Sequence, residues 1–234
     1  MRRLLYLVWL VAFGLGLWGV GERLVFGHRL AAYGSYVVWG LWVSVYIYLI
    51  GLSAGAFLLS SLVYVFRVER LERIGKLALF TAVVTLLTAL LSIWFDLGHM
   101  ERFYRVYTSP NFRSMMAWMI WLYTAYFLVL LGEAYLAFRP DLVRWSQEAG
   151  RSRLQRTVAR WLTLGRTSLE PDVLERERKV LQVLATVGVP LAVAFHGGVG
   201  ALFATVSAKL YWHQSIVPIL FLTGALVSGG GLLT

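Results

Sequence analysis

The chain has 234 residues, of which 59% are hydrophobic and 15% are charged, and its mean hydropathy is +0.69. Soluble domains are about 45–50% apolar and about 25% charged, so this composition excludes a soluble single-domain enzyme and a disordered chain. The absence of cysteine excludes a disulfide, a thiolate zinc site and an iron–sulfur cluster held by this chain alone. The net charge of +10 comes from residues between apolar segments, which favours a membrane surface over nucleic acid.

Six apolar segments predict an all-α, polytopic transmembrane helix bundle, because about 20 apolar residues are needed to cross a hydrocarbon core of about 30 Å. The predicted spans are Leu4–Val20, Tyr36–Phe66, Leu77–Leu97, Met115–Phe138, Val180–Ser207 and Ser215–Thr234. The first span follows a basic start, as a signal peptide does, but no clear cleavage site of small residues follows it. We therefore expect it to be retained.

The predicted organisation has four parts. Residues 1–35 hold the first span and an outer loop, residues 36–138 hold spans two to four, and residues 139–179 form a basic loop. Residues 180–234 hold the last two spans, and the final apolar run reaches the C-terminus without a polar tail. We therefore expect the chain to be the truncated part of a longer bundle.

The positions of the basic residues predict the orientation of the spans. Of the 22 Lys and Arg residues, 16 lie at the N-terminus, between spans two and three, or between residues 139 and 179. Basic residues accumulate on the cytoplasmic side of a membrane. The prediction is a multi-pass protein of the cytoplasmic (inner) membrane, with its N-terminus inside and the loop from Gly98 to Ser114 outside.

The basic loop carries apolar residues at helical spacing, among them Leu154, Val158 and Trp161, between arginines. This pattern is typical of a helix in the cytoplasmic interface, with its apolar face in membrane lipids and its arginines toward anionic headgroups. Nucleic-acid binding is the competing interpretation. The interface is favoured because it explains the tryptophans as well as the charges.

Ionisable groups near the spans are functional candidates, because polar groups are expensive to bury in a bilayer. Asp96 and His99 end the third span, and they share a face if the helix persists to His99. Such a pair exchanges protons near neutral pH. The alternative is a helix end that meets water or headgroups. Glu101 and Arg102 are expected at the rim of the pair.

Two further ionisable groups lie within predicted spans. His196 stands in the fifth span, and glycines follow it at 197, 198 and 200, which leaves room for a flat ligand. Its alternative role is structural, bonded to a carbonyl of a neighbouring helix. The estimated depths of Asp96, His99 and His196 coincide, which predicts one outer pocket. Glu133 is either a proton-relay carboxylate or a side chain that reaches the interface.

The order of the motifs resembles the NrfD/polysulfide reductase membrane-subunit family. The resemblance rests on Trp39-Gly40-Leu41-Trp42, Gly51 to Ala56, Asp96-Leu97-Gly98-His99-Met100-Glu101-Arg102-Phe103, Pro110 to Trp118, Pro190 to His196, and Trp212 to Phe221. It implies an integral subunit that reacts with quinone and contains no haem. It also implies more than six helices in the whole bundle.

The same resemblance implies the partners and the site. A ferredoxin-like iron–sulfur subunit with four clusters is expected on the outer face, with a molybdopterin or multihaem catalytic subunit beyond it. The cofactor is expected to be menaquinone or ubiquinone, with no metal held by this chain. The catalytic residues are expected to be Asp96 and His99, and the quinone-binding residues His196, Gly197, Gly198, Tyr46 and Arg102. Glu133 has no family counterpart, and its expected role as a proton relay rests on its place within a span alone.

Three other functions compete with this interpretation. A haem-binding cytochrome b-type anchor would use His196 with either His99 or His213 as axial ligands. A transporter or ion channel would use Glu133 and Asp96 as relay carboxylates. A purely structural membrane anchor shares every feature except quinone chemistry.

Overall fold

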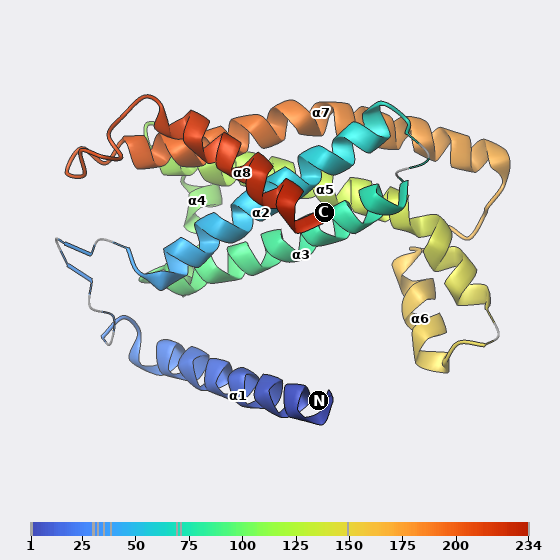
Figure 1. The fold of residues 1–234 in the computed structure, drawn as a ribbon, viewed down its shortest axis with the longest axis horizontal. Coiled ribbons are helices and arrows are strands. Elements are labelled where there is room, and N and C mark those ends of the chain that lie inside the picture. Colours follow the sequence, from blue (N-terminus) through green and yellow to red (C-terminus); the bar gives the residue numbers. More distant parts are fainter. Residues whose placement is uncertain are drawn as a thin grey trace.

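The computed structural model describes residues 2–29, 31, 33–34, 36–37, 39–68, 70, 72–148 and 150–233. Every regular element in these ranges is helical (Figure 1). The helices are α1 (Arg2–Phe26), α2 (Leu41–Val65), α3 (Glu72–Asp96), the short η2 (Met100–Arg102), α4 (Arg105–Thr108), α5 (Met115–Gln147), α6 (Arg153–Leu162), α7 (Pro171–Ala204) and α8 (Val217–Leu233).

Within the described ranges, five helices (α1, α2, α3, α5 and α7) are long and apolar enough to cross a membrane. The sixth apolar helix, α8, is shorter, with 17 residues from Val217 to Leu233. Each predicted span corresponds to one of these six helices. The prediction of an all-α, polytopic helix bundle is confirmed.

The helix ends differ from the predicted spans where charge or proline misled the sequence interpretation. Helix α5 continues nine residues past Phe138, through Pro140, to Gln147. Helix α7 begins at Pro171, nine residues before Val180. Its first turns are charged, and Pro at the first helical position lacks only an N–H that would be unsatisfied there anyway. An apolar run marks the part of a helix suited to lipid, not the whole helix.

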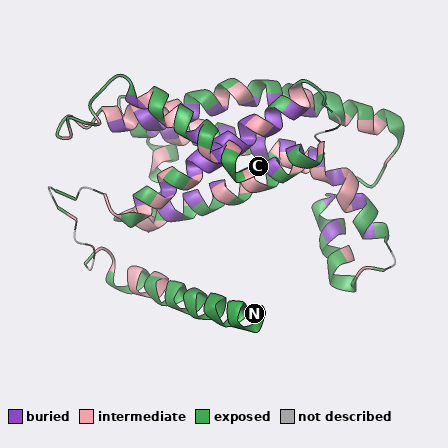
Figure 2. Cartoon of the chain, viewed as in Figure 1, coloured by how far each residue is buried: buried purple, intermediate pink, exposed green. Residues whose placement is uncertain are grey.

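Helix α2 lies at the centre of the bundle (Figure 2). It contributes an almost continuous buried stretch from Ile50 to Leu58, because α3, α7 and α8 pack around it. By contrast, no residue described in α1 is buried. A helix that is apolar on all sides needs lipid or protein around it. The exposed apolar surface of α1 is therefore suited to contact with the hydrocarbon core of a membrane.

Glycines allow α2 and α8 to cross at backbone contact. A Cβ atom added at Gly55 would overlap the Ala225 carbonyl oxygen and would lie 2.9 Å from the Cα atom of Gly229. Small residues permit such close approach of membrane helices. Gly51 and Gly55 therefore both face α8, with Gly55 at the point of contact.

Helix α6 is held by a capping box, in which Ser152 and Gln155 exchange side-chain and backbone hydrogen bonds. It packs against α5 through Ala159, while Leu154 and Trp161 stay exposed. The described structure thus forms the helix that the basic loop predicts, with a substantial apolar surface left open.

We predict that Gly55→Ala destabilises the protein by about 1–3 kcal/mol, the usual cost of overpacking, because α2 and α8 must separate. Gly224→Ala, also on α8, is the matched control, since a Cβ there meets nothing within 4 Å. Alanine has a higher helix propensity than glycine, so the stability of the Gly224→Ala variant is expected to be unchanged or slightly higher. Denaturant unfolding in detergent micelles measures both, and equal stabilities of the two variants would contradict the predicted contact.

Candidate functional site

Asp96 is the last residue of α3 and is tied to the segment before α2. The Tyr33 hydroxyl donates a hydrogen bond of 2.6 Å to Oδ1 of Asp96. Arg23 donates to the carbonyl oxygens of Phe95 and Leu97, at 2.7 and 2.6 Å. A cation is stabilising at a helix C-terminus, where carbonyl groups lack helical partners. These bonds attach the end of α1 to the end of α3.

The hydroxyl of Tyr33 stays protonated in this arrangement. Partial burial, the hydrogen bond to Asp96 and the negative charge of Asp96 raise the pKa of Tyr33 to about 12, because each disfavours the phenolate. Tyr33 therefore remains a donor to Asp96 throughout the neutral pH range.

His99 lies outside the helix that Asp96 ends. Because α3 stops at Asp96, the condition for a helical face shared by the two side chains, a helix that persists to His99, is not met. Gly98 and the turn into η2 direct the chain away. His99 instead places Nδ1 at 3.1 Å from Oε1 of Glu101, and Arg102 lies 3.5 Å from the same oxygen. These three side chains form an exposed cluster.

His196 is 2% exposed and lies between α7 and α8. Its Nε2 atom is 2.9 Å from the carbonyl oxygen of Phe221. A carbonyl only accepts, so Nε2 carries a proton, and in the neutral ring Nδ1 is then an acceptor. Nδ1 has no hydrogen-bond partner among the described residues. The expected structural bond to a neighbouring helix is present, and it leaves the second nitrogen available.

The glycines after His196 serve two purposes. A Cβ at Gly197 would meet nothing within 4 Å, so space is open there. At Gly198 it would lie 2.7 Å from Sδ of Met119, and at Gly200 it would lie 2.5 Å from the Cα of Pro218. Gly198 and Gly200 therefore permit close helix packing, whereas a side chain at Gly197 would meet open space.

Aromatic side chains from three helices form a group that includes Phe195, the residue before His196 on α7. The rings of Tyr46 on α2 and Tyr123 on α5 stack with centroids 6.1 Å apart. Tyr123 meets Phe195 edge to face at 4.4 Å, and Phe195 precedes His196 on α7. The hydroxyl of Tyr123 is buried and has no partner within the described structure. We call Tyr46, Tyr123, Phe195 and His196 the aromatic cluster.

Tyr123 was missed by the sequence interpretation, although its signal was present. Met119, Tyr123, Tyr126 and Glu133 recur at intervals of three, four or seven residues, which places them on one helix face. All four are buried in the structure. Tyr126 bonds to Ser53 on α2, whose hydroxyl oxygen lies 3.2 Å from that of Tyr126.

Glu133 is fully buried, so it does not reach the interface. Neither of its carboxylate oxygens has a hydrogen-bond partner in the described part of the chain. A Cβ at Gly188 on α7 would lie 3.1 Å from Oε1, and Phe57 occupies the same place. A buried carboxyl group without a partner is costly. Of the two roles considered for Glu133, burial removes the interfacial one.

The three predicted outer groups have separate partners. Asp96 binds Tyr33, His99 faces Glu101, and His196 binds the Phe221 carbonyl. Their convergence on one pocket stays a prediction. Tyr46 and His196 belong to the aromatic cluster, whereas Arg102 lies in the exposed cluster with His99.

These features define a multi-pass integral membrane protein with buried polar groups inside its helix bundle. The family model described as polysulphide reductase, NrfD, matches residues 30–234. The chain belongs to this family, which confirms the resemblance found from the motifs.

Several curated relatives extend the match. The chain is 44% identical to a selenate reductase subunit of Mesobacillus selenatarsenatis, over 90% of this chain and 50% of the relative. It is 28% identical to the Hdr-like menaquinol oxidoreductase integral membrane subunit of Archaeoglobus fulgidus, over 89% of this chain and 44% of the relative. It is 30% identical to the menaquinone reductase integral membrane subunit of Nitratidesulfovibrio vulgaris, over 55% of this chain and 32% of the relative. The chain thus spans half or less of the length of these relatives.

We predict that Tyr33→Phe loosens the attachment of α1 to α3, because Asp96 loses its donor at a cost of about 1.5–3 kcal/mol for a bond to a charged group. Hydrogen exchange of residues 23–34 should become faster. In the unaltered protein this stabilisation is complete below about pH 10, the ordinary pKa of tyrosine, and is lost as pH rises through the raised value of about 12. Tyr36→Phe is the control, since Tyr36 is 92% exposed. Equal exchange in both variants would contradict the role of Tyr33.

Proposed function

We propose that this chain is the quinone-binding part of a membrane oxidoreductase, which exchanges electrons between the membrane quinone pool and an extracytoplasmic iron–sulfur partner. The names of two relatives, a menaquinol oxidoreductase subunit and a menaquinone reductase subunit, support quinone as the ligand. The observation that carries the proposal is the pair of unpartnered polar atoms, Nδ1 of His196 and the hydroxyl of Tyr123, buried among aromatic rings.

The aromatic cluster fits a quinone ring chemically. Flat rings pack against aromatic faces, which Tyr46, Tyr123 and Phe195 provide. Ligand sites in proteins are mostly apolar, with a few polar groups that fix orientation. In this arrangement the hydroxyl of Tyr123 could donate a hydrogen bond to a carbonyl oxygen of the quinone, and it could also accept one from a quinol hydroxyl.

A bound quinone would exchange two electrons and two protons with its surroundings, and the protein must handle those protons. Because the Phe221 carbonyl holds the proton of His196 on Nε2, the neutral ring presents a lone pair at Nδ1. Nδ1 would therefore be able to accept one proton when a quinol is oxidised, and the imidazolium would be able to donate one when a quinone is reduced. This role is general base catalysis by a histidine fixed in one tautomer.

Asp96 and His99 are proposed to exchange protons with the outer aqueous phase, and Arg102 to border that opening. His99 is suited to this because its imidazole is exposed and lies 3.1 Å from a carboxylate oxygen of Glu101. Asp96 is suited because its carboxylate is half-buried at the end of α3. The bond from Tyr33 limits its movement.

Glu133 is proposed as a proton relay toward the opposite end of the bundle. Its buried carboxyl group lies one turn before Leu136 and Ala137, which line a cavity at that end. The Tyr64 hydroxyl, buried and without a partner among the described residues, borders the same cavity. Together they form a polar route from cavity water into the bundle.

The remaining assignments follow from charge and family. The C-terminal ends of α2 and α5, the N-terminal ends of α3 and α7, and helix α6 lie at one end of the bundle (Figure 1). We call it the basic end, and propose that it is cytoplasmic in the inner membrane. The Gly98–Ser114 segment is then outside, where a four-cluster iron–sulfur subunit docks and links to a molybdopterin or multihaem subunit.

We predict that His196→Gln and Asp96→Asn each lower quinone-dependent electron transfer by about 10²-fold, the usual effect of losing a general acid–base group. The measurement is steady-state turnover of the assembled complex with saturating quinol. His213→Gln is the matched control, because His213 lies in the exposed loop before α8 and its Nδ1 atom is 2.7 Å from the Ala204 carbonyl oxygen, away from the aromatic cluster. If both site variants assemble and keep full turnover, the chain acts as a structural anchor instead.

We predict that Glu133→Gln slows proton-coupled turnover by about 10- to 100-fold while leaving quinone binding intact, since glutamine keeps the shape but exchanges no proton. Turnover with a matched measurement of quinone affinity separates the two effects. Glu148→Gln, an exposed residue paired with Arg151, serves as control. Unchanged turnover in Glu133→Gln would remove the relay.

We predict that Ser109→Cys reacts with a membrane-impermeant maleimide in intact cells, whereas Thr157→Cys reacts only after the membrane is opened. Both side chains are exposed, and the natural sequence has no cysteine to interfere. The reverse pattern of labelling would invert the proposed orientation.

A further inference from the structure

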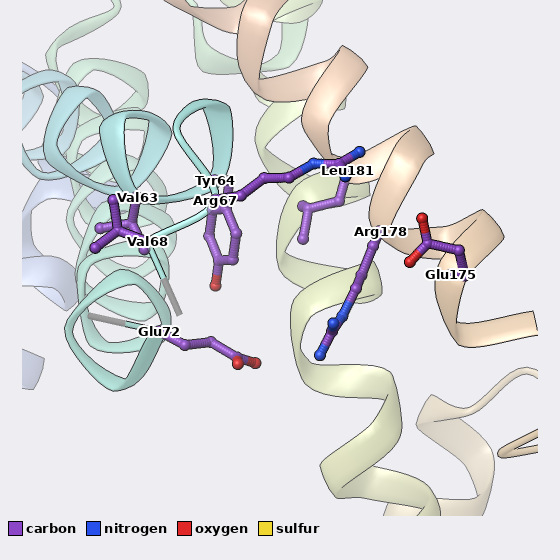
Figure 3. Close-up of a pocket in the computed structure, with 8 residues that line it drawn as sticks. All are labelled: Val63, Tyr64, Arg67, Val68, Glu72, Glu175, Arg178 and Leu181. Atoms are coloured by element: carbon purple, nitrogen blue, oxygen red, sulfur yellow. The ribbon is translucent and has the colours of Figure 1, made fainter. Parts of the chain in front are cut away.

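A polar cavity of about 660 Å³ opens between α3, α5 and α7 at the basic end, a volume within the usual range for ligand sites. A smaller adjoining pocket shares Tyr64, Glu72, Arg178 and Leu181 with it. Figure 3 shows Glu72 and Arg178 extending toward each other below Tyr64. Because the two spaces share these lining residues, we treat them as one cavity and call it the basal cavity.

Most acidic side chains of the basal cavity are already neutralised by cations. Glu177 binds the buried guanidinium of Arg139 at 2.5 Å. Asp141 receives Lys76 at 2.7 Å, and Lys76 also lies 3.2 Å from Glu72. Arg139 is held further by the carbonyl oxygens of Arg166 and Ser168. The carboxylates therefore contribute little free negative charge.

Two arginines on the wall of the basal cavity have no such neutralisation. Arg70 and Arg73 line it from the start of α3, and both are exposed. Within the described ranges, which omit residues 69 and 71, neither forms an ion pair. On the opposite side, Arg178 lines the cavity, and Arg144 lies 3.5 Å from Asp141 and completes the neutralisation of the carboxylates there. The cavity therefore presents an excess of positive charge to an entering ligand.

The walls between these charges are apolar. Leu136, Pro140, Leu174 and Leu181 line the cavity beside the arginines. Arginine matches phosphate oxygens with paired donors, and basic pockets between membrane helices suit phospholipid headgroups. Apolar walls next to such donors fit the glycerol and first acyl carbons of a lipid.

We propose that the basal cavity binds a phosphate group, held by Arg70, just before α3, and by Arg73 in its first turn, and approached by Arg144 and Arg178. This site is separate from the aromatic cluster and adds a ligand to the proposed quinone chemistry. The phosphate belongs to an anionic phospholipid or to a soluble phosphate. Its binding bridges the ends of α3, α5 and α7.

The test uses the full-length membrane subunit, purified in detergent and examined by native mass spectrometry. Phosphatidylglycerol, phosphatidylcholine and inorganic phosphate are titrated in separate arms. The variant is Arg70→Gln with Arg73→Gln. The matched control is Arg2→Gln with Arg3→Gln, which removes the same charge from the exposed start of α1.

We expect phosphatidylglycerol to bind more tightly than phosphatidylcholine, and the cavity variant to bind it about 10- to 30-fold more weakly, since each basic residue contributes about a factor of five. The control should retain its affinity. If inorganic phosphate binds with the same dependence on Arg70 and Arg73 and the lipid does not, the ligand is soluble phosphate. Equal binding of both lipids, or undiminished binding by the cavity variant, overturns the site.

Discussion

The hydrogen bond between His196 and the Phe221 carbonyl determines what the interior of this bundle can do. It joins α7 to α8, fixes the histidine in one tautomer and leaves Nδ1 free inside an aromatic cluster. The bond requires the two helices to lie close together, and Gly200 against Pro218 allows that approach. Gly55 and Gly229 hold α8 against α2 in the same way. The site therefore depends on backbone contacts that only small residues permit.

Burial of polar groups separates structural from functional positions in this chain. Ser53 and Arg139 are buried but bonded, to the Ala82 carbonyl and to Glu177 respectively. Nδ1 of His196, the hydroxyl of Tyr123 and the carboxyl group of Glu133 are buried without partners in the described structure. Buried polar atoms of this kind are stabilised when a ligand or a water molecule forms a hydrogen bond with them, or when a proton neutralises them. They follow a line from the aromatic cluster toward the basic end.

The sequence was sufficient to predict the spans and the family, because apolar length and motif order are local properties. It also singled out His196 and Glu133, since ionisable groups within apolar runs are rare. It was insufficient for His99, because α3 ends at Asp96, three residues before the position that would have aligned the two side chains. The donors to the end of α3, Tyr33 and Arg23, come from 63 or more residues away in the chain. No local pattern predicts such a contact.

The central claim is that quinone binds at the aromatic cluster, and direct photolabelling tests it. A photoreactive menaquinone analogue is bound to the assembled complex, irradiated, and located by peptide mapping. The account predicts labelling of peptides that contain Tyr46, Tyr123 or His196, with labelling abolished by excess menaquinone. Labelling confined to other helices, or labelling that excess menaquinone does not reduce, would contradict it.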